Sequence, residues 1–428
     1  MTIALVLLLL IVLVLINVPI AVAIAVVALA GMVAAHGTMA LVNGMLTFYS
    51  GATGFPMLAI PLFVLAGGLM NTSGISRRLI TFVSALVGFI RGGLAMVNIV
   101  VSMIFAEISG SAVADVAALG SVLIPEMKRR GYSGRFAAAV SSSAASLAVI
   151  IPPSLPMILY GAIADTSITQ LFIAGIVPGV LCGLAMMGLS YWYAIKFNLP
   201  REQAFSLRRL GTSFREAGWA LTLPVIILGG IFSGIVTATE AAGLAVFAAL
   251  VIGVFIYREL DLQLLHKSLV DGVVQTAAVM LLVTASAVLG GYLTELEVPV
   301  RLARTMLAIS ENRYVVLAML NVLFFGLGCV MHGAAAIVLI VPIVMPLVRQ
   351  LGIDPVHFGI VVTLNIAIGQ QTPPVASVLA VACSIAKEDM WAVTRVNLGY
   401  ITLLIATLLV VTYVPWFSTG LVTAIYGP

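Results

Sequence analysis

Small polar residues interrupt two long apolar runs, and these interruptions constrain the fold more than any other feature. Ser109-Gly110-Ser111 breaks the first run, while a Ser141–Ser143 patch and Pro152-Pro153-Ser154 break the second. In a bilayer, an unpaired backbone carbonyl or amide costs several kcal/mol, so irregular backbone survives only where it lines a protein cavity. Broken helices at mid-membrane depth therefore predict a transport site.

The composition indicates a bilayer environment. Hydrophobic residues make up 62% of the 428 residues and charged residues 8%, whereas soluble domains carry about a quarter charged residues. We therefore expect an all-α polytopic membrane protein in which residues 1–428 form a single membrane unit. The three cysteines lie in apolar runs without metal or disulfide spacing, so they predict packing residues.

Apolar runs of about 20 residues predict spanning helices. We expect helices at residues 2–16, 18–35, 56–72, 168–196, 218–236, 239–257, 268–294 and 394–416. The helix at 2–16 lacks a cleavage signal and is expected to be retained. Two basic segments, Arg77–Arg91 and Arg301–Arg313, fit helices that lie along the membrane interface. Residues 197–216 are expected to form the longest polar loop.

The remaining segments predict an inverted repeat of two halves. The first repeat (1–216) holds a re-entrant hairpin at 94–128 and a broken helix at 134–165, and the second (217–428) holds a hairpin at 314–350 and a broken helix at 356–386. Matched residues lie 221 positions apart in the pairs Ser111 and His332, Pro125 and Pro346, Gly131 and Gly352, and Pro152 and Pro373. Five crossings separate the hairpins, so the second enters from the opposite face, which predicts an inverted-topology repeat with a site near the midplane.

Basic residues predict the orientation. With the N-terminus outside, 16 of the 20 basic residues fall on the inner side and 4 fall outside. The positive-inside rule therefore predicts that both termini lie outside the cell membrane. Because the basic residues sit in short loops, the net charge of +4 is a topology signal, and nucleic acid is not an expected partner.

The breaks suit a sodium ion, a hard cation that prefers oxygen ligands. The candidate donors are Ser109 and Ser111, the Ser141–Ser143 patch, Gly369, Gln370 and Thr372. The half-helix amino ends beyond Pro152 and Pro373 carry partial positive charge, which suits an anionic substrate. Since no nucleophile–base pair, metal-ligand cluster or phosphate loop stands out, we expect a sodium-coupled carrier of an organic anion. We expect neither an enzyme nor a cofactor beyond the coupling ions.

Several of these residues have a second interpretation. The Ser141–Ser143 patch can hydrogen-bond to a neighbouring helix instead of an ion. Asp115 is an acid in an apolar arm, where a functional site is the default hypothesis, yet it can also cap the hairpin. His332 can be a ligand-facing donor, a proton-sensitive group or a packed imidazole, and Tyr160 can line the pocket or pack as an aromatic.

Three motifs resemble the large membrane (M) subunit of tripartite ATP-independent periplasmic (TRAP) transporters. They are SGSAVADVAALGSVLIPEMKRRGY, AAAVSSSAASLAVIIPPS and GIDPVHFGIVVTLNIAIGQQTPP. The resemblance covers essentially the whole chain. It implies the ion transporter superfamily fold, elevator movement driven by a sodium gradient, and a multi-pass position in the bacterial inner membrane with both termini periplasmic. It also implies two partners, a small four-helix membrane subunit and a soluble periplasmic substrate-binding protein.

The resemblance also implies site residues. The matched sodium-site positions are Ser109, Gly110, Ser111 and Asp115, then Ser142, Ser143 and Pro152, then Gly369, Thr372 and Pro373. At the second hairpin tip this chain has His332 followed by Gly333, where the family usually has an acid, and we include both in the expected Na+ sites at the two tips. The residues expected to line the substrate site are Ser154, Tyr160, Pro152, Pro373 and Gln370.

We therefore expect the large permease subunit of a TRAP transporter, which takes up a carboxylate-bearing solute such as sialic acid or a C4-dicarboxylate. A standalone sodium/dicarboxylate symporter of the same superfamily is the alternative, and it would need no binding protein. An intramembrane enzyme would need a convergent acid–base pair, which the sparse intramembrane acids do not suggest. A channel would lack the two-sided hairpins.

Overall fold

The computed structural model describes residues 9–427 except 11, 14, 15, 17, 202 and 203. Within that part every named element is a helix, and eight helices are long and apolar enough to cross a membrane. The predicted all-α polytopic fold is thus confirmed. The predicted helix at 2–16 falls largely outside the described residues.

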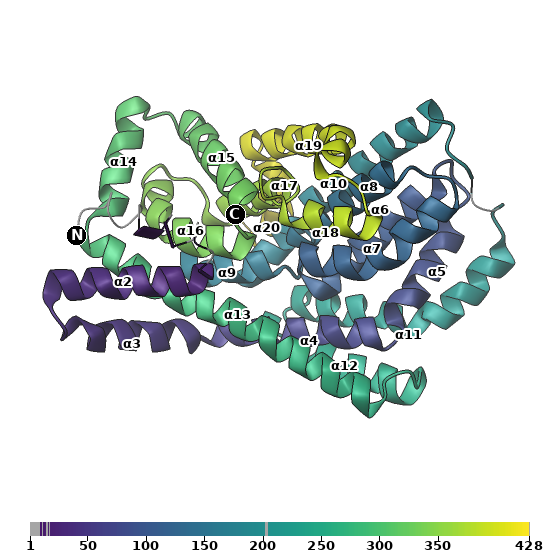
Figure 1. The fold of residues 1–428 in the computed structure, drawn as a ribbon, viewed down its shortest axis with the longest axis horizontal. Helices are drawn as coiled ribbons and strands as arrows, with labels where there is room; N and C mark the ends of the chain where they lie inside the picture. Colours follow the sequence, from purple (N-terminus) through teal and green to yellow (C-terminus); the bar gives the residue numbers. More distant parts are fainter. Residues whose placement is uncertain (1–8, 11, 14–15, 17, 202–203, 428) are drawn as a thin grey trace.

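One group of helices, which we call the scaffold layer, runs along the lower side of Figure 1. It comprises α2 (Ile20–His36), α3 (Ala40–Ala52), α4 (Ala59–Thr72), α11 (Leu207–Phe232), α12 (Ala238–Val251) and α13 (Leu262–Glu295). The short turns η1 (Phe55–Leu58) and η3 (Ile252–Ile256) flank α4 and α12. The 34-residue α13 organises this layer, since it packs along α2, α3 and α4.

Side-chain caps fix where the scaffold helices begin. Thr237 and Glu240 form a capping box at the start of α12, in which the Glu240 carboxylate accepts the Thr237 backbone N–H at 2.8 Å. Asp261 caps α13 by accepting the Leu264 N–H at 2.7 Å. These caps pair the amide groups that the first turn of a helix leaves without intrahelical partners.

A second group, the hairpin layer, lies above the scaffold layer in Figure 1. Its first half comprises α6 (Gly93–Ser109), α7 (Ala112–Arg129), α8 (Gly134–Ala145), η2 (Ser146–Val149), α9 (Leu155–Ala164) and α10 (Ile168–Lys196). Its second half comprises α15 (Arg313–Val330), α16 (Gly333–Gln350), α17 (Pro355–Gly369), α18 (Ser377–Ala386), α19 (Met390–Tyr413) and α20 (Trp416–Tyr426). Both predicted hairpins and both predicted broken helices are present. The opposed orientation of the halves and the repeat boundaries stay predictions.

Two short helices join the layers at opposite ends of Figure 1, α5 (Ile75–Val87) and α14 (Val298–Ile309). α5 is amphipathic, because Ile75, Leu79 and Val83 recur at four-residue spacing and are fully buried. α5 packs against α11 and α6, while α14 packs against α16 and, less extensively, α13. At 13 and 12 residues both are too short to span a bilayer.

Two features of the helix prediction are wrong. The expected loop at 197–216 is helical from Leu207 onward, because Ser206 caps α11 and arginines are tolerated in its first turns. Helices α3 and α20 are not predicted by apolar run length. In α3, a Cβ on Gly44 would lie 2.9 Å from Leu29, so this glycine permits close helix packing rather than marking a loop.

Candidate functional site

The tip of the first hairpin lies against the first break. α6 ends before Gly110, which has the left-handed φ of +57° that glycine adopts without strain. The backbone N–H of Leu155 donates to the Gly110 carbonyl at 3.3 Å. A Cβ on Gly110 would lie 3.1 Å from the Pro153 carbonyl oxygen, so the approach leaves little room for a side chain. The hairpin tip and the residues after the double proline therefore form one packed unit.

Ser111 and Asp115 begin the returning arm of this hairpin. The Ser111 side chain caps α7 by accepting the Ala114 N–H at 3.5 Å. Asp115 is fully buried in the first turn of α7, where the helix dipole favours a negative charge. The backbone of Ser109 closes α6, while its side chain lies outside the described part of the structure.

The tip of the second hairpin lies against the second break in the same way. The backbone N–H of Val375 donates to the Cys329 carbonyl at 3.1 Å. Gly328 and Gly369 meet where α15 crosses α17, because a Cβ on Gly369 would lie 2.6 Å from the Gly328 Cα. Gly333 packs directly on the Gln370 side-chain amide. His332 caps the start of α16 through its backbone and is exposed, with no side-chain cap hydrogen bond among the described residues.

A buried polar cluster joins the two broken helices to each other. The Ser143 hydroxyl lies 2.7 Å from both Gln371 Oε1 and Asn397 Oδ1. Asn397 Nδ2 donates to the Gln371 backbone carbonyl and to Oε1, each at 3.3 Å, and Gln371 Nε2 donates to Ser146 at 3.4 Å. All four residues are fully buried. We call Ser143, Ser146, Gln371 and Asn397 the Ser143 cluster.

The Ser143 hydroxyl contacts two amide oxygens but has only one proton to share between them. A serine hydroxyl carries one proton and can donate to one of the two amide oxygens at a time. The second oxygen contact needs either a cation or an amide turned to present its NH2 group. Next to the cluster, the Ser142 hydroxyl is buried with no hydrogen-bond partner among the described residues. The donor set of hydroxyl and amide oxygens fits a hard cation.

A second amide network lies behind the second tip. Asn365 Nδ2 donates to Asn321 Oδ1 at 2.7 Å and to the Val361 carbonyl at 2.8 Å. Asn321 in turn contacts Thr412 at 3.2 Å. In the described part of the chain, Asn365 Oδ1 is buried without a hydrogen-bond donor, one helical turn before Gly369. This network adds a further buried oxygen near the second hairpin tip.

Three other predicted site hydroxyls donate to backbone carbonyls. They are Ser154 to Val149 at 2.7 Å, Thr372 to Ile368 at 2.8 Å, and Tyr160 to Pro355 at 2.7 Å. An oxygen that donates its proton keeps its lone pairs, so these bonds leave Ser154 and Thr372 able to accept. The Tyr160 ring is fully buried beside Phe358.

The Ser143 cluster includes residues that the sequence reasoning does not select. Gln371, Asn397 and Ser146 of this cluster, and Asn365 of the second amide network, are absent from the expected site residues. Their signal is the amide or hydroxyl group itself, since polar side chains inside membrane helices are rare and usually functional. Among the described residues no three His, Cys, Asp or Glu side chains gather into a metal-binding group.

A cavity of about 810 Å³ lies between the two layers. It is lined from the scaffold side by α13 residues such as Ser286 and Thr294, and from the hairpin side by Val338 and Pro342 of α16. The connection between α9 and α10 closes one wall of the cavity. Its described lining includes none of the predicted site residues.

The arrangement is similar to a solved transporter structure. The crystal structure of the Alcanivorax borkumensis YdaH transporter matches with a TM-score of 0.63 at 18% identity, over 90% of each chain. At that identity the likeness concerns the fold alone. Together with the eight apolar helices, it defines the class of fold as that of a multi-pass membrane transporter.

The match to a family model identifies the protein family. Residues 7–417 match the family model of the tripartite ATP-independent periplasmic transporter, DctM component, so the chain belongs to that family. It is 43% identical to the isethionate TRAP transporter permease protein DctMQ of Oleidesulfovibrio alaskensis, over 91% of this chain and 61% of that protein. It is 36% identical to the C4-dicarboxylate TRAP transporter large permease protein DctM of Vibrio cholerae, over 92% and 91% of the two chains. It is 39% identical to the sialic acid TRAP transporter large permease protein SiaM of Vibrio cholerae, over 86% of each.

Proposed function

We propose that this large permease subunit moves an organic anion inward, driven by a sodium gradient. The observation that carries the proposal is the convergence of Ser143, Gln371 and Asn397 oxygens between the two broken helices, with two contacts of 2.7 Å. Sodium bound there would accept the lone pairs that one hydroxyl proton cannot satisfy. The ion would also bridge α8 to the segment after α17, so its presence would favour one arrangement of the breaks.

The proposed substrate carries a carboxylate or a related acid group. The relatives named above are called transporters of isethionate, C4-dicarboxylates and sialic acid, which are all organic acids. The half-helices α9 and α18 begin after the two double prolines, and their amino ends offer partial positive charge to an anion. We extend this anion class to the present chain, with delivery by a periplasmic binding protein.

The proposed movement is of the elevator type. The hairpin layer would slide against the scaffold layer that α13 organises, while α5 and α14 act as the joints. The cavity of about 810 Å³ between the layers would leave space for the hairpin layer to shift. A small four-helix membrane subunit would hold the scaffold layer still.

Transport in proteoliposomes tests the proposal. The chain is reconstituted with its small subunit, and uptake of a labelled organic acid loaded on the binding protein is measured with and without an inward sodium gradient. Uptake is expected to need both the gradient and the binding protein. Equal uptake in potassium would refute sodium coupling, and uptake of free substrate would favour a standalone symporter.

The variant Ser143→Ala tests the proposed ion site within the same assay. Loss of one ligand worth about 1.5–3 kcal/mol is expected to raise the half-saturating sodium concentration about ten- to hundredfold. Ser121→Ala is the matched control, because Ser121 is exposed and its hydroxyl bonds to Ala118 of its own helix. Equal sodium dependence in the two variants would remove Ser143 from the site.

A further inference from the structure

A second cavity lies where α5, the first hairpin and α11 meet. Its volume is about 420 Å³, within the range of small-molecule sites of about 300–1,000 Å³. Leu94, Val97 and Leu123 form a buried apolar floor. Phe89 and Phe205 stand at the edge with ring centroids 5.2 Å apart, and both rings are partly exposed. The cavity therefore combines an apolar interior with an edge of partly exposed aromatic rings.

The mouth of this cavity is strongly basic. Arg77, Arg129, Arg130 and Arg209 line it, and Glu126 is the one acid among the described lining residues. Glu126 pairs with Arg129 at 2.7 Å and with Arg130 at 3.0 Å, so one carboxylate serves two guanidinium groups. Arg209 has no ion pair with any described residue. Among the described lining residues the arginines therefore outnumber the acids, and Arg209 keeps a charge that no described residue pairs.

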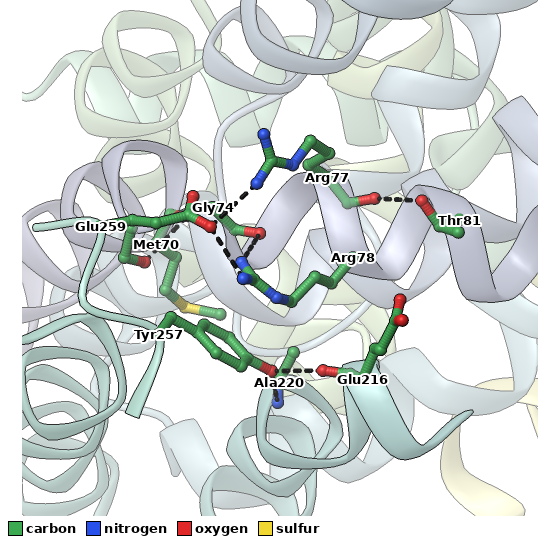
Figure 2. A network of polar contacts seen from close by, with 10 residues as sticks. Met70, Gly74, Arg77, Arg78, Thr81, Glu216, Ala220, Tyr257 and Glu259 are labelled. Atoms are coloured by element: carbon green, nitrogen blue, oxygen red, sulfur yellow. Dashed lines mark hydrogen bonds and ion pairs between the residues drawn. The ribbon is translucent and has the colours of Figure 1, made fainter. Parts of the chain in front are cut away.

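A polar network holds the α5 side of the mouth in place (Figure 2). Glu259 accepts from Arg77 at 2.8 Å and from Arg78 at 2.7 Å. The Arg78 guanidinium lies 3.8 Å from the centre of the Tyr257 ring. The Tyr257 hydroxyl reaches α11, where it donates to the Glu216 carbonyl at 3.0 Å. This network fixes α5 to the scaffold layer, so Arg77 is presented at the mouth by a built structure.

We propose that this cavity binds an anionic phospholipid of the surrounding membrane. The phosphate would lie among the guanidinium groups of Arg209, Arg77 and Arg129, since arginine recognises phosphate through paired N–H donors. One acyl chain would follow the apolar floor formed by Leu94 and Leu123. Basic pockets at the ends of membrane helices are suited to anionic headgroups, and the apolar floor selects a lipid over a free phosphate.

The position of the cavity gives the bound lipid a role. Its walls come from α5 and α11 on one side and from the hairpin helices α6 and α7 on the other. A lipid in it contacts the helix that joins the two layers and the hairpin that carries Gly110. Anionic lipid would therefore stabilise the packing of α5 on the first hairpin, independently of which solute is carried.

Lipid binding to the purified full-length chain tests the proposal. The delipidated protein is incubated in nanodiscs or detergent with phosphatidylglycerol, with phosphatidylcholine or with inorganic phosphate. Bound lipid is counted by native mass spectrometry, and the melting temperature is measured under each condition. Phosphatidylglycerol is expected to be retained and to raise the melting temperature. Equal retention of phosphatidylcholine, or equal stabilisation by inorganic phosphate alone, would overturn the proposal.

Two variants localise the site. Arg209→Gln is expected to weaken phosphatidylglycerol retention about tenfold, the loss of one charge-assisted contact. Arg208→Gln, which removes the same charge from the preceding residue outside the cavity, is expected to leave retention unchanged. Val122 lines the cavity with a side chain that is 51% exposed, so Val122→Trp should fill part of the cavity. This variant should reduce lipid retention without changing any charge. Equal losses in Arg209→Gln and Arg208→Gln, or full retention in Val122→Trp, would refute this location.

Discussion

The contact between Gly328 and Gly369 makes the second hairpin tip sensitive to a single methyl group. In Gly369→Ala, the new Cβ would lie 2.6 Å from the Gly328 Cα and 2.9 Å from the Cys329 backbone nitrogen. Relaxed carbon–carbon contacts lie at about 3.5–4.0 Å, so α15 and α17 would have to separate by about 1 Å. The obstacles are backbone atoms, which cannot turn away as a flexible side chain would.

The surrounding packing makes this separation costly. From Val356 to Gly369 every residue of α17 is buried, so the helix cannot shift toward solvent or lipid. Extra atoms in a well-packed core cost about 1–3 kcal/mol. We expect Gly369→Ala to lose stability in this range. We also expect the shift to disturb the hydrogen bond from Val375 to the Cys329 carbonyl, and with it transport.

Gly326→Ala is the matched control on the neighbouring helix. A Cβ on Gly326 meets no other atom within 4 Å, and alanine is favoured over glycine inside a helix by about 0.5–1 kcal/mol. The melting temperature in detergent is therefore expected to fall for Gly369→Ala and to stay or rise for Gly326→Ala, with uptake lost only in the first. Equal melting temperatures would show that α15 and α17 are not in close contact, and would refute the reasoning.

Three further variants probe the Ser143 cluster and the polar network around Glu259 and Tyr257 (Figure 2). Asn397→Asp removes the two N–H donors to Gln371 and adds a buried negative charge. Because a buried unpaired charge is strongly destabilising, the free energy of unfolding without sodium should fall by about 3–5 kcal/mol. If the Ser143 cluster binds sodium, added sodium should restore the melting temperature of Asn397→Asp more than potassium does; an equal response would favour a plain hydrogen-bond network. Glu259→Gln should lower the free energy of unfolding by on the order of 1 kcal/mol, because the ion pairs of Glu259 with Arg77 and Arg78 are partly exposed. Glu216→Gln is the charge-matched control. Glu216 has no ion pair among the described residues, so this variant should leave the stability unchanged. Tyr257→Phe should cost about 1 kcal/mol through the lost bond to Glu216, and an unchanged melting temperature would mean that the hydroxyl does not tie the α12–α13 connection to α11.

The breaks are predictable from the sequence because the bilayer forbids irregular backbone elsewhere. Ser109-Gly110-Ser111 and the two double prolines lie where the helices stop, as expected. The Ser143 cluster is not predictable in this way. Ser143 meets Gln371 across 228 positions and Asn397 across 254, and no local pattern encodes such pairs.

Local signals also fail where a residue type has two uses. The glycines of α3 resemble loop residues, yet Gly44 and Gly51 allow close packing on α2 and α13. Tyr160 stays a predicted pocket residue from its place after the first break, and its hydroxyl donates to the Pro355 carbonyl in the core. The choice between these uses depends on neighbours that only the folded structure supplies.

The packing between the halves supports a hairpin layer that would behave as one body in the proposed movement. The second piece of the first broken helix, α9, packs on the hairpin helix α16, while its counterpart α18 packs on α7 and α8. Each half therefore supports the hairpin of the other, and Gln371 adds a polar link to Ser143 at the centre. A shift of one tip must be followed by the other, because separating them would expose the buried faces of α9 and α18. Hydrogen exchange should accordingly report α9 and α16 opening together; independent opening would contradict a rigid hairpin layer. In the proposed elevator movement, a rigid layer of this kind would let two short helices, α5 and α14, act as its joints.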